Sequence, residues 1–244
     1  MMSIEQVEEL LNIWGFPHHH WELTVGNTQL AFNPKTMIMT WVVMILVALF
    51  AVAATRKMSL RRPTGAQNMF ELCFESIWGL VKQNMDARKG QTIITVVVTY
   101  FIFILFANLI GLVPTLTSPT ADYNTTLALS LCTFALIYVM GVKYKGLGYF
   151  KHYVTPNPIF LPINILEDVS KPITLTFRLY GNIYGGEVLI VVLLGLITGW
   201  VHFLGGFVAS VLWLAFSIFV GCIQAFLFTM LSIAYFSMAV SEDH

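Results

Sequence analysis

The residue with the clearest chemical consequence is an arginine inside a long apolar stretch. Residues 174–182 read TLTFRLYGN, with Arg178 at the centre, and a mostly aliphatic run follows. A guanidinium stays protonated at physiological pH, and placing it at bilayer depth costs roughly 2.5–3.5 kcal/mol on insertion scales. We therefore expect Arg178 to face a cavity or an anionic partner inside the membrane. A fixed cation in such a place indicates ion or proton handling.

Small and polar residues share the arginine's face of the predicted helix. At 100° per residue, Lys171, Gly181, Asn182 and Gly185 lie on the same side as Arg178. The spacing of Gly181 and Gly185 permits close approach by another helix. This face therefore combines a permanent charge, an amide and a surface suited to helix packing.

Two carboxyl groups flank the arginine along the same helix. Glu187 follows nine positions after Arg178, which places it on the opposite face. Glu167 joins the face of Arg178 only if Pro172 leaves the helix unbroken. The helix thus presents a fixed cation on one side and a titratable carboxyl on the other.

The last apolar stretch carries a weaker polar stripe. Ser217, Gln224 and Tyr235 recur on it at near-heptad spacing, together with Ser210, Gly221 and Ser232. Interhelical hydrogen bonds alone could account for the serines. A buried amide needs several partners, and a position opposite Arg178 would supply some of them for Gln224.

Composition places these residues in a membrane protein. The 244 residues are 57% hydrophobic and 11% charged, with zero formal net charge, and the mean hydropathy is +0.75. A soluble domain is excluded by these values, and the net charge favours no nucleic-acid partner. Three scattered cysteines have neither metal nor redox spacing.

We predict an all-α integral membrane protein with about five transmembrane helices and one amphipathic surface helix at about 64–89. The last two apolar stretches greatly exceed the length of a direct crossing, so we expect a strongly tilted helical hairpin over about 161–240. The five stretches are Met37–Ala54, Thr92–Leu112, Leu127–Val142, about Leu161–Leu196 and about Val201–Val240.

Basic residues predict the orientation. Lys and Arg gather at 56–62 and 143–151, whereas residues 113–126 contain neither. The positive-inside rule then places segment 1–36 outside and the tail 241–244 in the cytoplasm, flanking one membrane domain at 37–240. No cleavable signal peptide is expected in the first thirty residues, and His18, His19 and His20 fit a wetted interfacial segment better than a metal tract.

The chain resembles subunit a of the F-type ATP synthases, most strongly from about residue 105 to 240. One segment, LPINILED at 161–168, is particularly similar to the chloroplast and cyanobacterial branch. The other motifs that carry the resemblance are KP at 171–172, FRLYGN at 177–182, YGGE at 184–187, QAF at 224–226, NLIGLVP at 108–114 and DYNTT at 122–126.

The resemblance implies a stator that conducts ions against a rotating ring of c subunits, each with a membrane carboxylate. Two offset half-channels would load and unload these carboxylates, and Arg178 matches the family's essential arginine between them. Its charge would favour the ionised carboxylate. Peripheral-stalk b-type subunits and the lipid bilayer are the other expected partners, and a bacterial plasma membrane is the expected location.

The resemblance also implies roles for secondary residues. Glu187 matches the outer channel glutamate, Glu167 a carboxylate near the cytoplasmic exit, and Asp122 one near the outer entrance. Asn182 and Gln224 match polar residues that flank the arginine. Some bacterial relatives have a histidine where this chain has Ser217, so water or Tyr235 would replace an imidazole beside Glu187.

Other functions fit the sequence less well. A stand-alone secondary transporter with a polar site around Arg178 predicts internal repeats and broken helices, and we find no repeat between 37–142 and 161–240. An intramembrane enzyme needs a nucleophile–base or metal-ligand set. The sequence also has no phosphate-binding glycine loop, so we expect no catalysis of ATP chemistry, no metal and no cofactor. The choice of H⁺ or Na⁺ and the ring size stay open.

Overall fold

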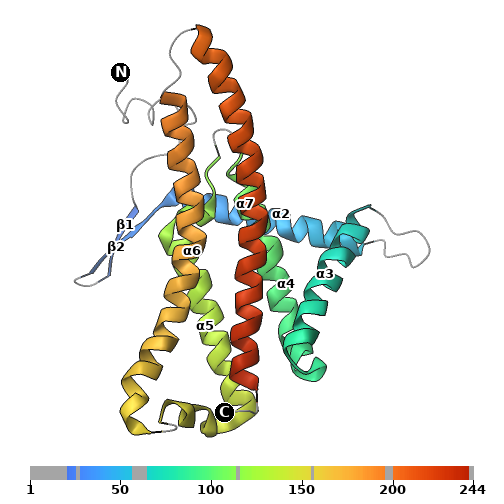
Figure 1. Ribbon diagram of the computed structural model, residues 1–244, viewed down its shortest axis with the longest axis vertical. Coiled ribbons are helices and arrows are strands. Elements are labelled where there is room, and N and C mark those ends of the chain that lie inside the picture. Colours follow the sequence, from blue (N-terminus) through green and yellow to red (C-terminus); the bar gives the residue numbers. More distant parts are fainter. Residues whose placement is uncertain are drawn as a thin grey trace.

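The computed structural model describes residues 21–25, 28–56, 65–113, 116–154, 157–195 and 200–241, so the tract His18–His20 lies outside the described residues. A short antiparallel hairpin precedes a set of helices (Figure 1). The elements are β1 (Trp21–Val25), β2 (Thr28–Phe32), α2 (Pro34–Thr55), α3 (Gly65–Asn84), α4 (Ala87–Ile110), α5 (Tyr123–Lys145), α6 (Leu161–Gly195) and α7 (Trp200–Val240), with short 3₁₀ helices η1 (Pro119–Ala121), η2 (Gly146–Tyr153) and η3 (Pro158–Phe160).

The all-α membrane fold is confirmed. Four helices in the described part are long and apolar enough to cross a membrane, namely α2, α4, α5 and the portion Ser210–Val240 of α7. The fifth expected span, α6, forms a continuous helix of 35 residues but also carries several charged residues. Pro172 lies inside α6 without ending it, so Glu167 and Arg178 belong to one helix.

Two local features differ from the sequence expectations. The surface helix ends at Asn84 rather than near residue 89, because Asp86 is the N-cap of α4 and the second span begins at Ala87. The strands β1 and β2 were not predicted at all. Trp21 pairs with Phe32 at one end of the hairpin, and Val25 pairs with Thr28 at the other end, where two residues separate the strands in the sequence.

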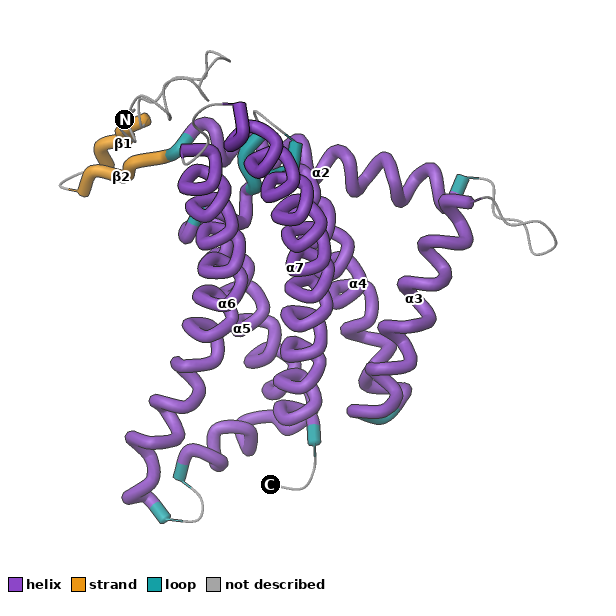
Figure 2. The backbone as a smooth tube through the Cα atoms, turned by 45° about the horizontal axis from the view of Figure 1, so that its top comes forward, coloured by secondary structure: helices purple, strands orange, loops and turns teal. Residues whose placement is uncertain are grey.

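The long helices α6 and α7 run side by side, and α4 and α5 pack along them (Figures 1 and 2). In both views α2 lies across the long axis that α6 and α7 share, so no orientation aligns all three with a membrane normal. The 41 residues of α7 extend roughly 60 Å, about twice the ~30 Å hydrocarbon core. Both observations favour the tilted hairpin expected from the sequence.

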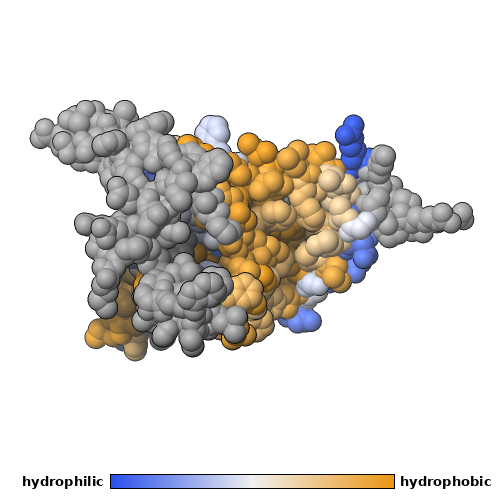
Figure 3. Space-filling view, turned by 90° about the horizontal axis from the view of Figure 1, so that it is seen from above, coloured by the Kyte–Doolittle hydropathy of each residue, from blue (hydrophilic) through white to orange (hydrophobic). Residues whose placement is uncertain are grey.

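The apolar residues of the chain serve two purposes. One part packs into a core between α3, α4, α5 and α7, with Val97, Val81 and Phe236 fully buried. Another part stays on the surface, as on α2, where Trp41, Ile45 and Leu49 are exposed. The described surface seen from above is mostly hydrophobic, and hydrophilic atoms gather at one end (Figure 3). Such a surface suits lipid or other membrane subunits.

Candidate functional site

The described part of α6 presents Arg178 without a partner. Leu175 and Leu179 on the same turns are buried against α4 and α7, whereas Phe177 is exposed and Arg178 is half-buried. No described carboxylate lies within ion-pair distance of the guanidinium, and no described residue accepts a hydrogen bond from it. The arginine is therefore available to a group outside the described residues of this chain.

The surface beside the arginine is open. A Cβ added at Gly181 or Gly185 would meet no described atom within 4 Å. Helix packing at these glycines, expected from their spacing, thus has no described partner within this chain. The small residues leave room on the face of Arg178 for a helix from another chain.

Polar side chains from α4, α6, α7, η1 and the residue before η1 form a neutral group on the α6–α7 connection side of Arg178. We call it the amide cluster; its members are Asn108, Ser118, Thr120, Asn182 and Gln224. The Nδ2 of Asn182 donates to Oε1 of Gln224 at 2.7 Å, which joins α6 to α7. Gln224 is 1% exposed, and its Nε2 has no hydrogen-bond partner among the described residues.

Asn108 fixes the other half of the amide cluster. Its Nδ2 donates to the backbone oxygen of Gly221 at 3.1 Å, and its Oδ1 accepts from the hydroxyl of Thr120 at 2.7 Å. A Cβ at Gly221 would lie 3.2 Å from the Cβ of Asn108, so the glycine allows α4 to approach α7 this closely. The hydroxyl of Ser118 donates to the backbone oxygen of Ala107 at 2.8 Å.

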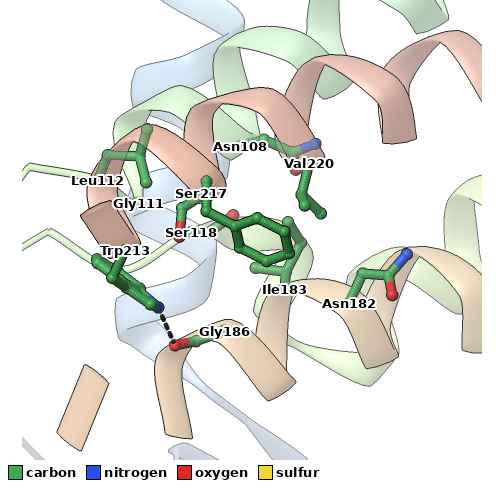
Figure 4. A pocket seen from close by; sticks show the side chains of 11 residues that line it. Asn108, Gly111, Leu112, Ser118, Asn182, Ile183, Gly186, Trp213, Ser217 and Val220 are labelled. Atoms are coloured by element: carbon green, nitrogen blue, oxygen red, sulfur yellow. Dashed lines mark hydrogen bonds between the residues drawn. The ribbon is translucent and has the colours of Figure 1, made fainter. Parts of the chain in front are cut away.

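A cavity adjoins the amide cluster (Figure 4). Asn108, Ser118, Asn182 and Ser217 contribute polar atoms to its wall, and Trp213 closes one side by donating its Nε1 hydrogen to the backbone oxygen of Gly186 at 3.1 Å. The volume of about 50 Å³ holds a few water molecules, since one needs roughly 10–15 Å³. The wall is mostly apolar, and its few polar atoms are the hydrogen-bonding sites that water in the cavity would use.

A second polar group lies on the other side of Arg178, near the start of α6. We call it the carboxylate cluster; its members are Tyr138, Tyr153, Asp168 and Lys171. Asp168 is 5% exposed. One of its oxygens, Oδ1, accepts from Nζ of Lys171 at 2.5 Å, while Oδ2 accepts from the hydroxyls of Tyr138, at 3.0 Å, and Tyr153.

The carboxylate cluster also connects several elements. Nζ of Lys171 lies 5.9 Å from the ring centre of Tyr235 on α7, and Nδ2 of Asn164 donates to the backbone oxygen of Tyr153 at 3.1 Å. Burial, together with hydrogen bonds to Asp168 and Tyr138, raises the pKa of Tyr153 far above its ordinary value. Tyr153 is therefore a neutral hydrogen-bond donor at physiological pH.

An apolar layer separates the two clusters. The layer contains Tyr100, Ile104, Leu175, Leu179, Ala225 and Phe228, all buried in one contiguous group from α4, α6 and α7. The ring of Phe228 packs edge-on against Tyr100 at 5.9 Å. Arg178 lies at the level of this layer along α6, between Leu175 and Leu179, but on another face of the helix.

The remaining predicted residues lie at the edges of these groups. Asp122 caps α5 by accepting from the backbone N–H of Asn124 at 2.9 Å, and the adjacent Tyr123 packs on Phe177 at 6.0 Å. Glu167 has a 61% exposed side chain 3.9 Å from Lys171. The side chain of Glu187 lies outside the described residues.

The structure corrects one expected pairing and adds residues to the site. Gln224 bonds Asn182 rather than Arg178. Asn108 and Asp168 lie in motifs that carry the family resemblance, but the sequence assigned no role to either. Their burial could have been suspected, because polar residues within apolar spans require partners. No described group of three or more His, Cys, Asp or Glu residues could hold a metal ion.

Comparison with known proteins relates these features to one family. Residues 37–237 match the family model described as ATP synthase A chain. The chain is 47% identical to ATP synthase subunit a of Desulforamulus reducens, an alignment covering 98% of this chain and 92% of the relative. It is 39% identical to subunit a of Priestia megaterium, with coverages of 92% and 99%, and 37% identical to that of Bacillus subtilis, with 93% and 100%.

Proposed function

This chain belongs to the ATP synthase A chain family and is a multi-pass subunit of the membrane sector rather than a catalytic subunit; from this premise we propose that it is the ion-translocating stator. A ring of c subunits with membrane carboxylates rotates against α6 and α7. Two offset half-channels carry ions, in our proposal protons, between the ring and opposite sides of the membrane. Arg178 is the barrier between them.

The observation that carries this proposal is the position of Arg178. It lies between two polar clusters, level with the buried apolar layer that separates them, and no described group of the chain pairs with it. The open glycine face beside it accepts a small ring helix. A cation there lowers the pKa of a nearby carboxylate, so a ring carboxylate passing Arg178 gives up its proton. The fixed charge also prevents a direct path between the half-channels.

The amide cluster fits the outer half-channel. Its cavity has room for water, and Gln224 bonds Asn182, which lines that cavity. Asn182 and Ser217 line the same cavity and can hydrogen-bond a water chain. Asp122 would mark the entrance and Glu187 would pass protons toward the ring, with Tyr235 at a distance from this cavity, beside Lys171.

The exposed Glu167 fits the cytoplasmic exit. It is a carboxyl at the start of α6, beyond the apolar layer from the cavity, and solvent reaches most of its side chain. With the N-terminus outside, the basic segment 143–151 that precedes α6 lies on the same side as this exit. Exposed apolar residues on α2 and α3, such as Trp41 and Leu72, are contacts for lipid or peripheral-stalk b-type subunits.

A secondary transporter is the alternative. Its substrate site would require interrupted helices at the membrane midplane, whereas α6 passes Arg178 and Pro172 as one continuous helix. A cation without a partner among the described residues, on an open face, also favours a protein partner over a small enclosed substrate. The stator is therefore the better-supported function.

ATP-driven proton pumping in liposomes tests the proposal. The purified complex with Arg178→Ala is compared with the unmodified complex, and ring content is measured in both. We expect the assembled variant to lose pumping and to leak protons passively. If the variant carries out coupled pumping at the same rate as the unmodified complex, Arg178 has only a structural role.

A further inference from the structure

Two basic residues, Lys171 and Arg178, lie on the same face of α6, but only Lys171 has a described partner. Lys171 precedes Arg178 by seven residues, which is two helical turns or about 10 Å of rise. Lys171 is held by Asp168, whereas Arg178 has no described partner. The face proposed to meet the ring therefore contains one compensated and one uncompensated charge.

The compensation of Lys171 comes mainly from Asp168. Nζ of Lys171 lies 2.5 Å from Asp168 and 3.9 Å from Glu167. Asp168 is almost fully buried and Glu167 is mostly exposed. Because solvent screens an exposed pair far more than a buried one, Asp168 supplies most of the neutralising field at the ammonium group.

The two tyrosines that bond Asp168 carry no charge. Tyr138 and Tyr153 donate to its second oxygen, and Tyr235 places its ring near Lys171. Both donors hold the carboxylate in its ionised form and in a fixed direction. Asp168 and Lys171 thus form a contacting pair of opposite charges.

We propose that Asp168 is a positioning residue for ion translocation: it neutralises and retains Lys171, so that Arg178 is the single uncompensated cation that the α6 face presents to the ring. The proposal rests on the proposed stator function. If Asp168 were neutral, Lys171 would present a second cation two turns from Arg178. A ring carboxylate would then meet two places that favour its ionised form, and protonation between them would be impaired.

A purely mechanical role for the same residues makes a different prediction. The carboxylate cluster ties α6 to α5, η2 and α7, and loss of these bonds could simply loosen the start of α6. Removing both charges separates the two explanations. The variant Asp168→Asn/Lys171→Gln abolishes the ion pair but leaves no second cation.

The test compares three variants of the complete complex in liposomes. We expect Asp168→Asn to slow ATP-driven pumping about tenfold, the change in protonation that one pKa unit brings. The double variant Asp168→Asn/Lys171→Gln is expected to recover to within about twofold of the unmodified rate. The single variant Lys171→Gln should pump nearly normally, because it adds no cation to the face of Arg178.

The outcomes are decisive in either direction. The proposal would be overturned if Asp168→Asn pumped at the rate of the unmodified complex. It would also be overturned if the double variant pumped as slowly as Asp168→Asn. If Asp168→Asn does not assemble, Lys171→Gln still decides, because the mechanical role predicts that it too is severely impaired. Arg178→Ala in the same series reports on the stator function itself: its unimpaired pumping would reject that function whatever the Asp168 variants do.

Discussion

The amide cluster and the carboxylate cluster lie on the same two long helices but satisfy their polar atoms in opposite ways. The amide cluster is neutral, has a buried Nε2 of Gln224 without a described partner and adjoins a cavity. In the carboxylate cluster both oxygens of Asp168 are bonded and its charge is matched by Lys171. One cluster is therefore suited to exchange water, and the other to hold charges in place.

The apolar layer keeps the amide cluster and its cavity apart from the carboxylate cluster. Leu179 and Phe228 are fully buried between the clusters, so water in the cavity would have to enter a buried, mainly apolar region to reach the start of α6. Protons that cross the level of Arg178 must then travel on another carrier. In the proposed function the ring carboxylates are this carrier.

The largest effect is expected from breaking the apolar layer. Leu179→Asn places an amide where a 0% exposed leucine packs, and an unsatisfied buried amide costs about 1–3 kcal/mol. We expect lower thermal stability and a clear rise in passive proton leak through the assembled complex in liposomes. Leu179→Met, which roughly conserves volume, is the control and should cost less than about 1.5 kcal/mol. An equally tight membrane with Leu179→Asn would show that the layer is not a barrier.

Removing the amide of Gln224, which bonds the cavity-lining Asn182, should have an intermediate effect. Gln224→Leu deletes the acceptor of Asn182 and the unpaired Nε2, while one interhelical hydrogen bond in a membrane contributes only about 0.6 kcal/mol. We expect normal assembly and slower ATP-driven pumping, because Asn182 loses the acceptor that orients its amide beside the cavity. Thr229→Val is the matched control: Thr229 is buried on the same helix but bonds the backbone oxygen of Ala225. Equal pumping by the two variants would remove Gln224 from the path.

The smallest effect is expected at the exposed edge of the carboxylate cluster. Glu167→Gln removes a 61% exposed carboxyl 3.9 Å from Lys171, and exposed ion pairs contribute about 0–1 kcal/mol. We expect unchanged thermal stability and a modest slowing of proton release, measured as the pumping rate. Asp168→Asn, one residue further, provides the contrast. Should Glu167→Gln destabilise the complex as much as Asp168→Asn, the distinction between a buried and an exposed partner would be wrong.

Much of the fold could be predicted because the sequence shows directly where the apolar runs lie and which of them are too long for a straight membrane crossing. The four membrane-crossing helices follow from runs such as 37–54, and the excess length of α7 indicated a tilted hairpin. The end of the surface helix was harder to place, because only two residues separate the end of α3 at Asn84 from the start of α4 at Ala87. Asp86 occupies the N-cap position of α4. The hairpin β1–β2 could have been predicted, because residues 21–25 alternate between apolar and polar side chains and the next two residues are Gly and Asn.

The site was predictable where a residue is chemically unusual on its own. An arginine within an apolar run indicates a functional site from the sequence alone, as does a glutamine such as Gln224. The partners were not predictable, because they depend on which turns of different helices meet. Nothing in the local sequence of Asn108 shows that it bonds Gly221, more than a hundred positions later, and the same holds for Tyr138 and Asp168.

Thiol accessibility from the two sides of the membrane tests the central claim most directly. In a chain whose Cys73, Cys132 and Cys222 are replaced by serine, Ser217→Cys reports on the cavity and Ser170→Cys on the start of α6. Sealed vesicles of both orientations, containing the whole complex, are treated with a membrane-impermeant thiol reagent. We expect Ser217→Cys to react only from the outer side and Ser170→Cys only from the cytoplasmic side. Reaction of both from the same side would contradict two half-channels separated at Arg178.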